Sequence, residues 1–96
     1  MAQFDVLRVA GNVLVLDCQS DFLDELPTRF VVPLRPKMKV KPGKLTPLLD
    51  LGREQLVMVT PLARSINVRD IVATVTNVGD QEYVIKAALD MLITGF

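Results

Sequence analysis

Acidic side chains cluster in a short segment near the start of the chain, and they are the first group that could do chemistry. Asp17, Asp21, Asp24 and Glu25 offer carboxylate oxygens, which are the ligands that Mg²⁺ and Ca²⁺ prefer in proteins. Their spacing matches no metal-binding loop motif. The sequence therefore favours a solvated acidic loop that holds no metal ion.

Nucleophilic catalysis lacks its usual partners in this sequence. The chain contains no histidine, which excludes the commonest general base and every histidine-dependent triad. Cys18 is the only cysteine, so it cannot form an intramolecular disulfide and is expected to be a core residue in a reducing compartment. Arginines could still assist RNA cleavage through the 2′-hydroxyl, but no spacing selects a site among Arg29, Arg53, Arg64 and Arg69. We expect no catalytic residue and no cofactor.

Residues 35–44 form a basic segment with five basic and no acidic residues. In an extended backbone, alternate side chains share one side and could follow a phosphate backbone. However, no aromatic residue interleaves the segment, and small-barrel proteins that bind single strands usually stack bases on aromatics. The chain as a whole balances 11 basic against 11 acidic residues, which argues against general polyanion binding. A solvated loop is favoured, with nucleic-acid contact as the alternative.

Two groups of apolar residues lie in segments that are expected to be exposed to solvent. Phe22 and Leu23 lie between Asp21 and Asp24, either as a plug tucked under the loop or as exposed anchors for a partner. The second group is the end of the chain, Ile93 to Phe96, and a terminal Phe frays unless it docks on something. Two apolar anchors without catalytic chemistry favour a binding function over an enzymatic one.

Strand signals dominate the first three quarters of the chain. Residues 4–9 and 13–19 are separated by Gly11-Asn12, a pair that suits a two-residue hairpin turn. Leu14, Leu16 and Cys18 share one face of the second strand, and Val13 and Val15 share the other, so both faces should be covered. Pro33 marks the predicted strand 30–34 as an edge or a bulge. Further strands are predicted at 45–51, 55–60 and 70–76, with an irregular connection at 62–69.

The end of the chain has helical spacing. Residues 81–93 are predicted to form a helix with Asp80 as N-cap, Glu82 in the first turn and Gly95 closing it. Its apolar residues sweep about 240°, whereas one core face needs roughly 100°. The excess predicts a second surface that a partner buries.

These elements predict one domain over residues 1–96, built as a small β-barrel or strongly bent sheet followed by a C-terminal helix. Half of the residues are apolar, which is enough for a modest core. No segment approaches the roughly 18 apolar residues that span a bilayer, and the N-terminus lacks the apolar stretch of a secretory signal. A cytoplasmic protein without membrane contact is expected.

Three segments resemble the CcdB-type toxins of bacterial toxin–antitoxin modules: the opening MAQFDV, residues 16–34 and residues 82–96. The best parts are the block Gln19-Ser20-Asp21 with the following Val-Pro-Leu, and the apolar helix that ends in Gly plus one apolar residue. The resemblance implies an SH3-like small barrel of antiparallel strands with a C-terminal helix, acting as a homodimer. It also implies that the toxin traps the A subunit of DNA gyrase on cleaved DNA, and that a CcdA-type antitoxin neutralises it and represses the operon with it.

The resemblance also implies a gyrase-binding face. Its residues are Phe22, Leu23, Asp90, Ile93, Thr94, Gly95 and Phe96. A well-known family member has Trp at the position of Thr94 and Asn at the position of Asp90, so this chain lacks an indole and adds a carboxylate there. We expect gyrase binding to be retained, with Phe96 replacing part of the lost apolar area.

One alternative belongs to the enzymes. Toxins of the MazF or Kid kind cleave mRNA and share the small-barrel fold. Such an enzyme needs an arginine and an acid or threonine near a dimer groove, and this sequence offers candidates without a pattern.

Overall fold

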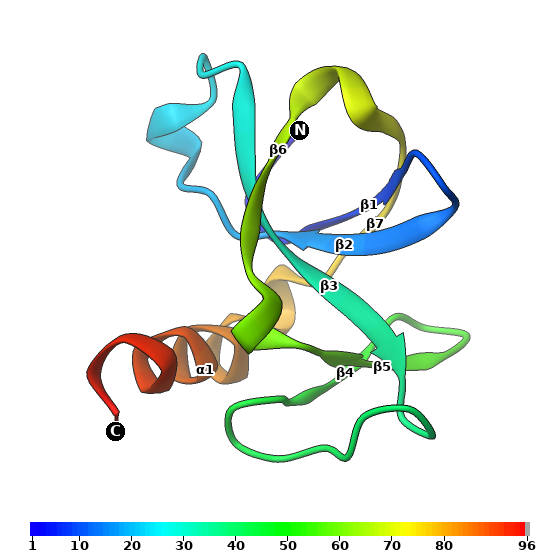
Figure 1. Ribbon diagram of the computed structural model, residues 1–96, viewed down its shortest axis with the longest axis vertical. Coiled ribbons are helices and arrows are strands. Elements are labelled where there is room, and N and C mark those ends of the chain that lie inside the picture. Colours follow the sequence, from blue (N-terminus) through cyan, green and yellow to red (C-terminus); the bar gives the residue numbers. More distant parts are fainter. Residues whose placement is uncertain (96) are drawn as a thin grey trace.

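Antiparallel strands form one curled sheet, and a single α-helix packs against one end of it (Figure 1). The computed structural model describes residues 1–95, so Phe96 lies outside the described residues. The strands are β1 (Asp5–Val9), β2 (Val13–Asp17), β3 (Thr28–Pro36), β4 (Leu48–Asp50), β5 (Gln55–Met58), β6 (Arg64–Asn67) and β7 (Ile71–Asn77). The helices are α1 (Glu82–Thr94) and four 3₁₀ turns, η1 (Asp21–Leu23), η2 (Thr60–Leu62), η3 (Val68–Asp70) and η4 (Gly79–Gln81).

The long strand β3 is the reason the sheet curls. The strand order is β4-β5-β3-β2-β1-β7, and β6 pairs with β3 outside this path. The first residues of β3 pair with β6, whereas its last residues pair with β5. One strand thus belongs to two parts of the sheet that turn away from each other. The predicted architecture, a strongly bent antiparallel sheet with a terminal helix, is confirmed as a curled half-barrel.

Pro33 lies inside β3, and the prediction that it marks an edge or a bulge is wrong, because β3 is paired on both sides without a register shift. It pairs with Val15 of β2, and on its other side its carbonyl accepts a hydrogen bond from the amide of Val59 at 2.9 Å. In an antiparallel strand the N and O atoms of a residue point to the same side. The N–H that proline lacks would therefore point to the same side as its carbonyl, toward Val59, so the reciprocal hydrogen bond of this pair is absent at the point where β3 joins β5.

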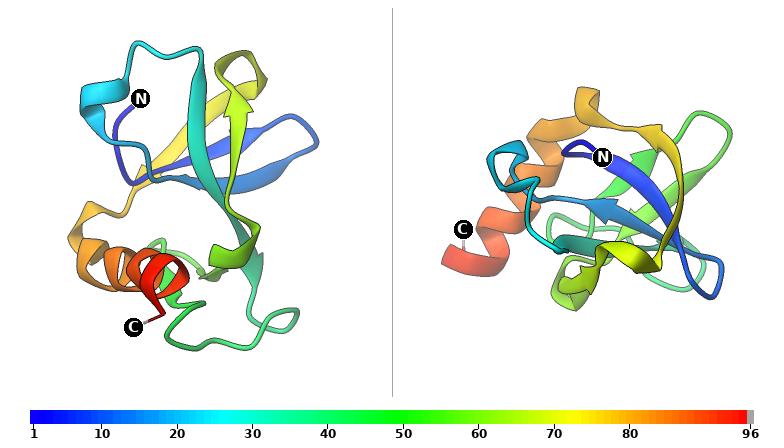
Figure 2. Two further views of the ribbon diagram at one scale, coloured as in Figure 1. Left: turned by 60° about the vertical axis from the view of Figure 1, so that its left-hand side comes forward. Right: turned by 90° about the horizontal axis from the view of Figure 1, so that it is seen from above.

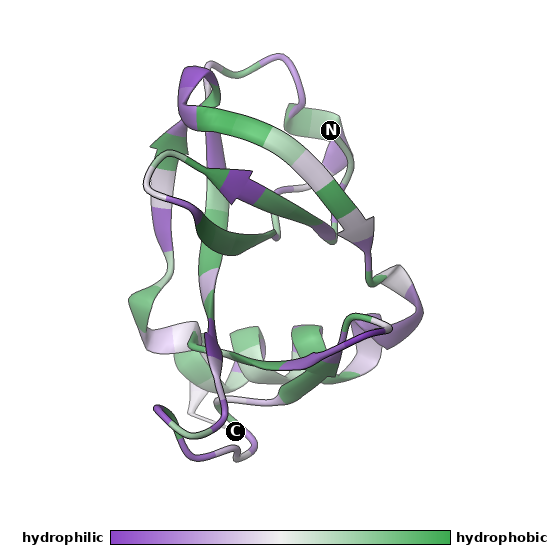
Figure 3. Ribbon diagram, turned by 90° about the vertical axis from the view of Figure 1, so that its right-hand side faces the viewer, coloured by the Kyte–Doolittle hydropathy of each residue, from purple (hydrophilic) through white to green (hydrophobic). Residues whose placement is uncertain are grey.

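Two apolar clusters lie on opposite faces of the β1–β2 hairpin, as its sequence pattern predicts. Leu16 and Cys18 belong to the larger cluster, which also contains Ile85 and Ala88 of α1. Val15 belongs to the smaller cluster, which β6 and β7 cover. Figure 3 shows hydrophobic residues along the strands and α1, with hydrophilic residues mainly in the turns.

The turn of this hairpin is longer than predicted. Val9 pairs with Val13, so the loop has three residues, Ala10 to Asn12. Gly11 and Asn12 both take left-handed backbone conformations, at φ 88° and 60°. These are the residue types that adopt such angles most readily, which explains why the pair stands there.

Two other expectations about strands need correction. Residues 62–69 are not irregular, because β6 pairs with the first half of β3 there. Its residues are exposed or half-buried, so it lacks the apolar alternation that would reveal a strand. The strand predicted at 45–51 is limited to β4, three residues long.

The helix begins later than predicted, and Asp80 is not its N-cap. Asp80 lies inside η4, and Gln81 occupies the N-cap position without a capping side-chain bond. The side chain of Gln81 instead joins the helix to β4, accepting from the amide of Asp50 at 2.9 Å and donating to its carbonyl at 2.7 Å. The helix ends as predicted at Gly95, at φ 83°.

Candidate functional site

The acidic segment contains one buried charge, so its interpretation as a wholly solvated loop is wrong for Asp17. Asp17 and Arg29 are both fully buried, and a carboxylate oxygen lies 2.9 Å from Nε and 2.6 Å from Nη2 of the arginine. Burial raises the pKa of the Asp17 carboxyl, although hydrogen bonds from Arg29 and the backbone of Gln19 act in the opposite direction. The pair is therefore an internal anchor rather than a metal site.

Gln19 connects this anchor to the loop that carries Phe22. Its amide donates to Asp17 at 3.0 Å, and its side chain accepts from the amide of Phe30 at 2.9 Å. The same side chain donates to the carbonyl of Leu23 at 2.7 Å. Because Gln19 is itself buried, it fixes the end of η1 to the sheet.

Hydrogen bonds also hold the start of η1. The Ser20 hydroxyl accepts from the amide of Phe22 at 3.2 Å, as an N-cap does. The amide of Gln3 donates to Asp21 at 2.8 Å, which ties the N-terminal segment to the loop. The backbone of η1 is thus positioned from both ends.

Phe22 projects into solvent from this held backbone. Its side chain is 98% exposed, and that of Leu23 is 49% exposed. The interpretation of these residues as a plug under the loop is therefore excluded. A fully exposed aromatic ring gains almost none of the free energy that burying its apolar surface would provide. The position of Phe22 therefore suits contact with another molecule.

The end of α1 carries the second apolar group. Ile93 is 80% exposed, and Asp90, Thr94 and Gly95 are exposed as well. The Thr94 hydroxyl donates to the carbonyl of Asp90 at 2.7 Å, and the Gly95 amide donates to the carbonyl of Met91 at 2.9 Å. The last turn is therefore ordered up to Gly95.

The structure places these two groups on one side of the molecule but does not bring them together. In Figures 1 and 2, η1 and the end of α1 lie on the same side of the molecule, well apart from each other. Within one chain, η1 and the end of α1 are therefore two separate exposed segments rather than one continuous patch.

A comparison with protein families matches the CcdB protein over residues 3–95. This chain belongs to the CcdB family. A search of curated proteins gave no match. CcdB-family proteins are toxins of bacterial toxin–antitoxin modules. The match confirms the resemblance to these toxins that the sequence indicated.

The groups that could do catalysis are dispersed in this CcdB-family chain. Arg29 is buried in its ion pair, whereas Arg53, Arg64 and Arg69 are exposed on a turn, on β6 and on η3. Burial raises the pKa of the Cys18 thiol to about 12, which leaves it protonated and unreactive at neutral pH. Within residues 1–95, no three side chains of His, Cys, Asp or Glu are placed to hold a metal ion, and no helix is long and apolar enough to cross a membrane.

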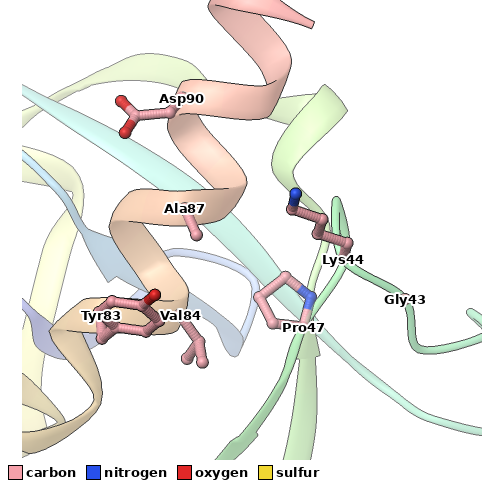
Figure 4. A pocket seen from close by; sticks show the side chains of 7 residues that line it. All are labelled: Gly43, Lys44, Pro47, Tyr83, Val84, Ala87 and Asp90. Atoms are coloured by element: carbon pink, nitrogen blue, oxygen red, sulfur yellow. The ribbon is translucent and has the colours of Figure 1, made fainter. Parts of the chain in front are cut away.

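One surface feature was not predicted from the sequence. An open pocket of about 470 Å³ lies between α1 and the loop after β3 (Figure 4). We call it the helix–loop pocket, and its lining residues are Gly43, Lys44, Pro47, Tyr83, Val84, Ala87 and Asp90. The basic segment and the apolar excess of the helix are the two sequence signals that meet there, but only the fold brings them together.

Proposed function

We propose that this CcdB-family toxin binds the A subunit of DNA gyrase and traps the enzyme on cleaved DNA. Residues 1–96 act as one toxin domain in the cytoplasm, as a homodimer and without catalysis of its own. A cognate CcdA-type antitoxin neutralises the toxin and represses the operon with it. Contact with DNA is indirect, through gyrase or the antitoxin complex.

The observation that carries this proposal is the exposure of Phe22 on a backbone held at both ends. A flexible loop would pay conformational entropy on binding, whereas η1 is ordered by bonds from Gln3, Gln19 and Ser20. Exposed aromatic anchors on rigid backbone are typical of residues that dominate the affinity of an interface.

The end of α1 supplies the second contact in this proposal. Ile93 adds apolar area, and Gly95, with nothing within 4 Å of where a Cβ would stand, lets a partner approach the backbone closely. Phe96 completes the proposed contact, and its position lies outside the described residues. In the proposed homodimer, two such helix ends are presented to gyrase.

The test adds purified toxin to gyrase, plasmid DNA and ATP, and then traps cleaved DNA with denaturant. We expect linear plasmid with the full chain and none with a chain that lacks residues 94–96. Phe22→Ala should need at least about tenfold more protein for the same cleavage, the effect of losing a hot spot of about 1.4 kcal/mol or more. Met38→Ala is the matched control, because Met38 is 87% exposed on a different loop.

Two results would contradict the proposal. If the full chain leaves the plasmid supercoiled, gyrase is not the target. If the chain without residues 94–96 still causes cleavage, the end of α1 is not the contact. RNA incubated with the same preparation tests the alternative, since cleavage that needs no gyrase would identify an mRNA endonuclease.

A further inference from the structure

A tight turn in the N-terminal segment contains a strained residue. The amide of Asp5 donates to the carbonyl of Ala2 at 3.1 Å, and the amide of Ala2 donates to the side chain of Asp5 at 2.8 Å. We call residues 2–5 the N-terminal turn. Its third residue, Phe4, has φ 71°, and within residues 1–95 Asn12 is the only other non-glycine residue with a positive φ. Turns with a positive φ at the third residue usually place glycine there, because other residues are strained.

The surroundings of Phe4 hold it in this conformation. Its ring is buried in the larger apolar cluster, and a ring carbon lies 3.9 Å from where a Cβ of Gly79 would stand. Its amide donates to the carbonyl of Asp17 at 2.6 Å, and its carbonyl accepts from the amide of Val78 at 2.9 Å. Strain persists only where the structure around it is this restrictive, and such residues are concentrated at functional sites.

On one side, the N-terminal turn holds η1. The amide of Gln3 donates to Asp21 of η1 at 2.8 Å, and the Gln3 side chain donates to the carbonyl of Cys18 at 3.2 Å. Because β1 begins at Asp5, the turn directs Gln3 to η1 instead of extending the strand. The position of η1, which carries Phe22, therefore depends on the turn.

On the other side, Asn77 joins the N-terminal turn to α1. Its side-chain nitrogen donates to the carbonyl of Gln3 at 3.1 Å and to the carboxylate of Asp5 at 2.9 Å. Its side-chain oxygen accepts from the amide of Gly79 at 2.8 Å, in η4 just before the helix. Figure 2 shows the N-terminal segment running from η1 toward the segment that leads into α1.

We propose that the N-terminal turn and Asn77 are positioning elements that fix η1 relative to α1, and that target binding depends on this fixed arrangement. The inference rests on the proposed function, in which η1 and the end of α1 are the two gyrase contacts. When both contacts belong to one rigid body, forming the first brings the second into place without a further loss of conformational freedom. Because α1 is continuous over Glu82–Thr94, fixing its start also fixes its far end.

The first experiment compares two asparagines. Asn77→Ala removes the bonds to the turn and to Gly79. Asn67→Ala is the matched control, since Asn67 accepts from the amide two residues ahead in the same way, at 3.0 Å from Arg69, and has no bond to the turn. We expect Asn77→Ala to need at least about threefold more toxin for the same gyrase-dependent plasmid cleavage, and Asn67→Ala to match the unmodified chain.

Amide hydrogen exchange, measured by NMR without gyrase, separates positioning from general stability. The amide of Leu23 donates to the carbonyl of Ser20 at 2.9 Å within η1, so its exchange reports the opening of that element. In Asn77→Ala its exchange should quicken at least about threefold, and by a larger factor than that of the β2 amides. A loss of stability alone would raise the β2 rates at least as much.

A paired substitution provides the rescue. Asn77→Asp places a second carboxylate beside Asp5 and should weaken cleavage as Asn77→Ala does. The double variant Asp5→Asn/Asn77→Asp exchanges the two side chains, so that a donor faces an acceptor again and the net charge is unchanged. We expect it to recover most of the lost cleavage.

The bond from the turn to η1 is tested at Gln3. Proline suits the second position of such a turn and has no amide hydrogen, so Gln3→Pro keeps the turn but cannot donate to Asp21. Gln3→Ala keeps the amide and loses only the side-chain bond to Cys18. Gln3→Pro should need at least about threefold more toxin than Gln3→Ala, and this pair tests the proposal even if Asn77→Ala does not fold. Circular dichroism and urea unfolding establish which variants are folded.

Failure of this inference is distinguishable from failure of the proposed function. If the unmodified chain causes no cleavage, the proposed function fails and this inference fails with it. If the unmodified chain causes cleavage, and the folded variants at Asn77 and Gln3 act at the same concentrations as their controls, the proposed function stands and the positioning role is overturned. A larger change in exchange at β2 than at Leu23 would also overturn it, because Asn77 would then stabilise the whole sheet.

Discussion

At the scale of single residues, the buried Asp17–Arg29 pair decides how the Phe22 loop is presented. The pKa of the Asp17 carboxyl is raised, which means that burial costs the carboxylate more than its contacts stabilise it. Within residues 1–95, Nη1 of Arg29 has no hydrogen-bond partner, so the pair is not fully satisfied. The Asp17–Arg29 pair matters more because it positions Gln19 than because it stabilises the fold.

Removing one partner of this pair should be far worse than removing both. Asp17→Asn leaves the guanidinium of Arg29 buried without a counter-charge, and we expect it to lower the free energy of unfolding by about 3–5 kcal/mol. The double variant Asp17→Leu/Arg29→Met removes both charges and should be clearly more stable than Asp17→Asn. Urea unfolding at one fixed protein concentration measures both differences. A double variant less stable than the single one would contradict this account of the pair.

At the scale of elements, the end of α1 depends on one left-handed residue. Gly95 has φ 83°, with nothing within 4 Å of where a Cβ would stand, so a larger residue there meets backbone strain without a steric clash. Gly43, where a Cβ would make an ordinary contact with the Thr46 hydroxyl at 3.7 Å, has no such φ. The two glycines therefore separate backbone strain from side-chain size.

Gly95→Ala should lower the free energy of unfolding by about 1 kcal/mol, because alanine is strained in the left-handed region. Gly43→Ala should leave stability unchanged or raise it slightly, since it removes freedom only from the unfolded chain. Thermal unfolding followed by helical circular dichroism compares the two. Equal effects at both positions would show that the conformation of Gly95 does not hold the helix end.

At the scale of the whole molecule, several large apolar side chains lie outside the core and remain exposed to solvent. Only Ile85 and Ala88 of α1 are buried, whereas Leu92 and Ile93 are 42% and 80% exposed. Among residues 1–95, β7 is the last strand of the order and pairs with β1 alone, and its Val72 is 69% exposed. A partner that covers part of this surface would stabilise the fold.

We expect sedimentation velocity at micromolar concentration to give twice the 10.6 kDa mass of one chain. Leu92→Glu places a charge on the uncovered face of α1 and should shift the equilibrium toward the monomer. Leu26→Glu is the matched control, because Leu26 is 46% exposed in the loop before β3. A monomer across the whole concentration range would contradict the proposed homodimer.

The sequence alone determined what can be read along one element. Alternation in residues 13–18 predicted two covered faces of a hairpin, and helical spacing with Gly95 predicted where α1 ends. The missing histidine removed most catalytic chemistry, and three segments of the chain pointed to the CcdB family. Such patterns are visible because the side-chain period of a strand or helix is local.

Only the tertiary structure decided which distant residues meet. Asp17 looks like a loop acid until the fold buries it against Arg29. The strand β6 shows no apolar alternation because its residues are exposed or half-buried, so only its pairing with β3 reveals it. The exposure of Phe22 and the position of Lys44 and Tyr83 around one pocket depend equally on how the sheet bends around β3. These contacts join residues far apart in the chain. Their energies come from burial and pairing, which the spacing of residues within one strand or helix does not reveal.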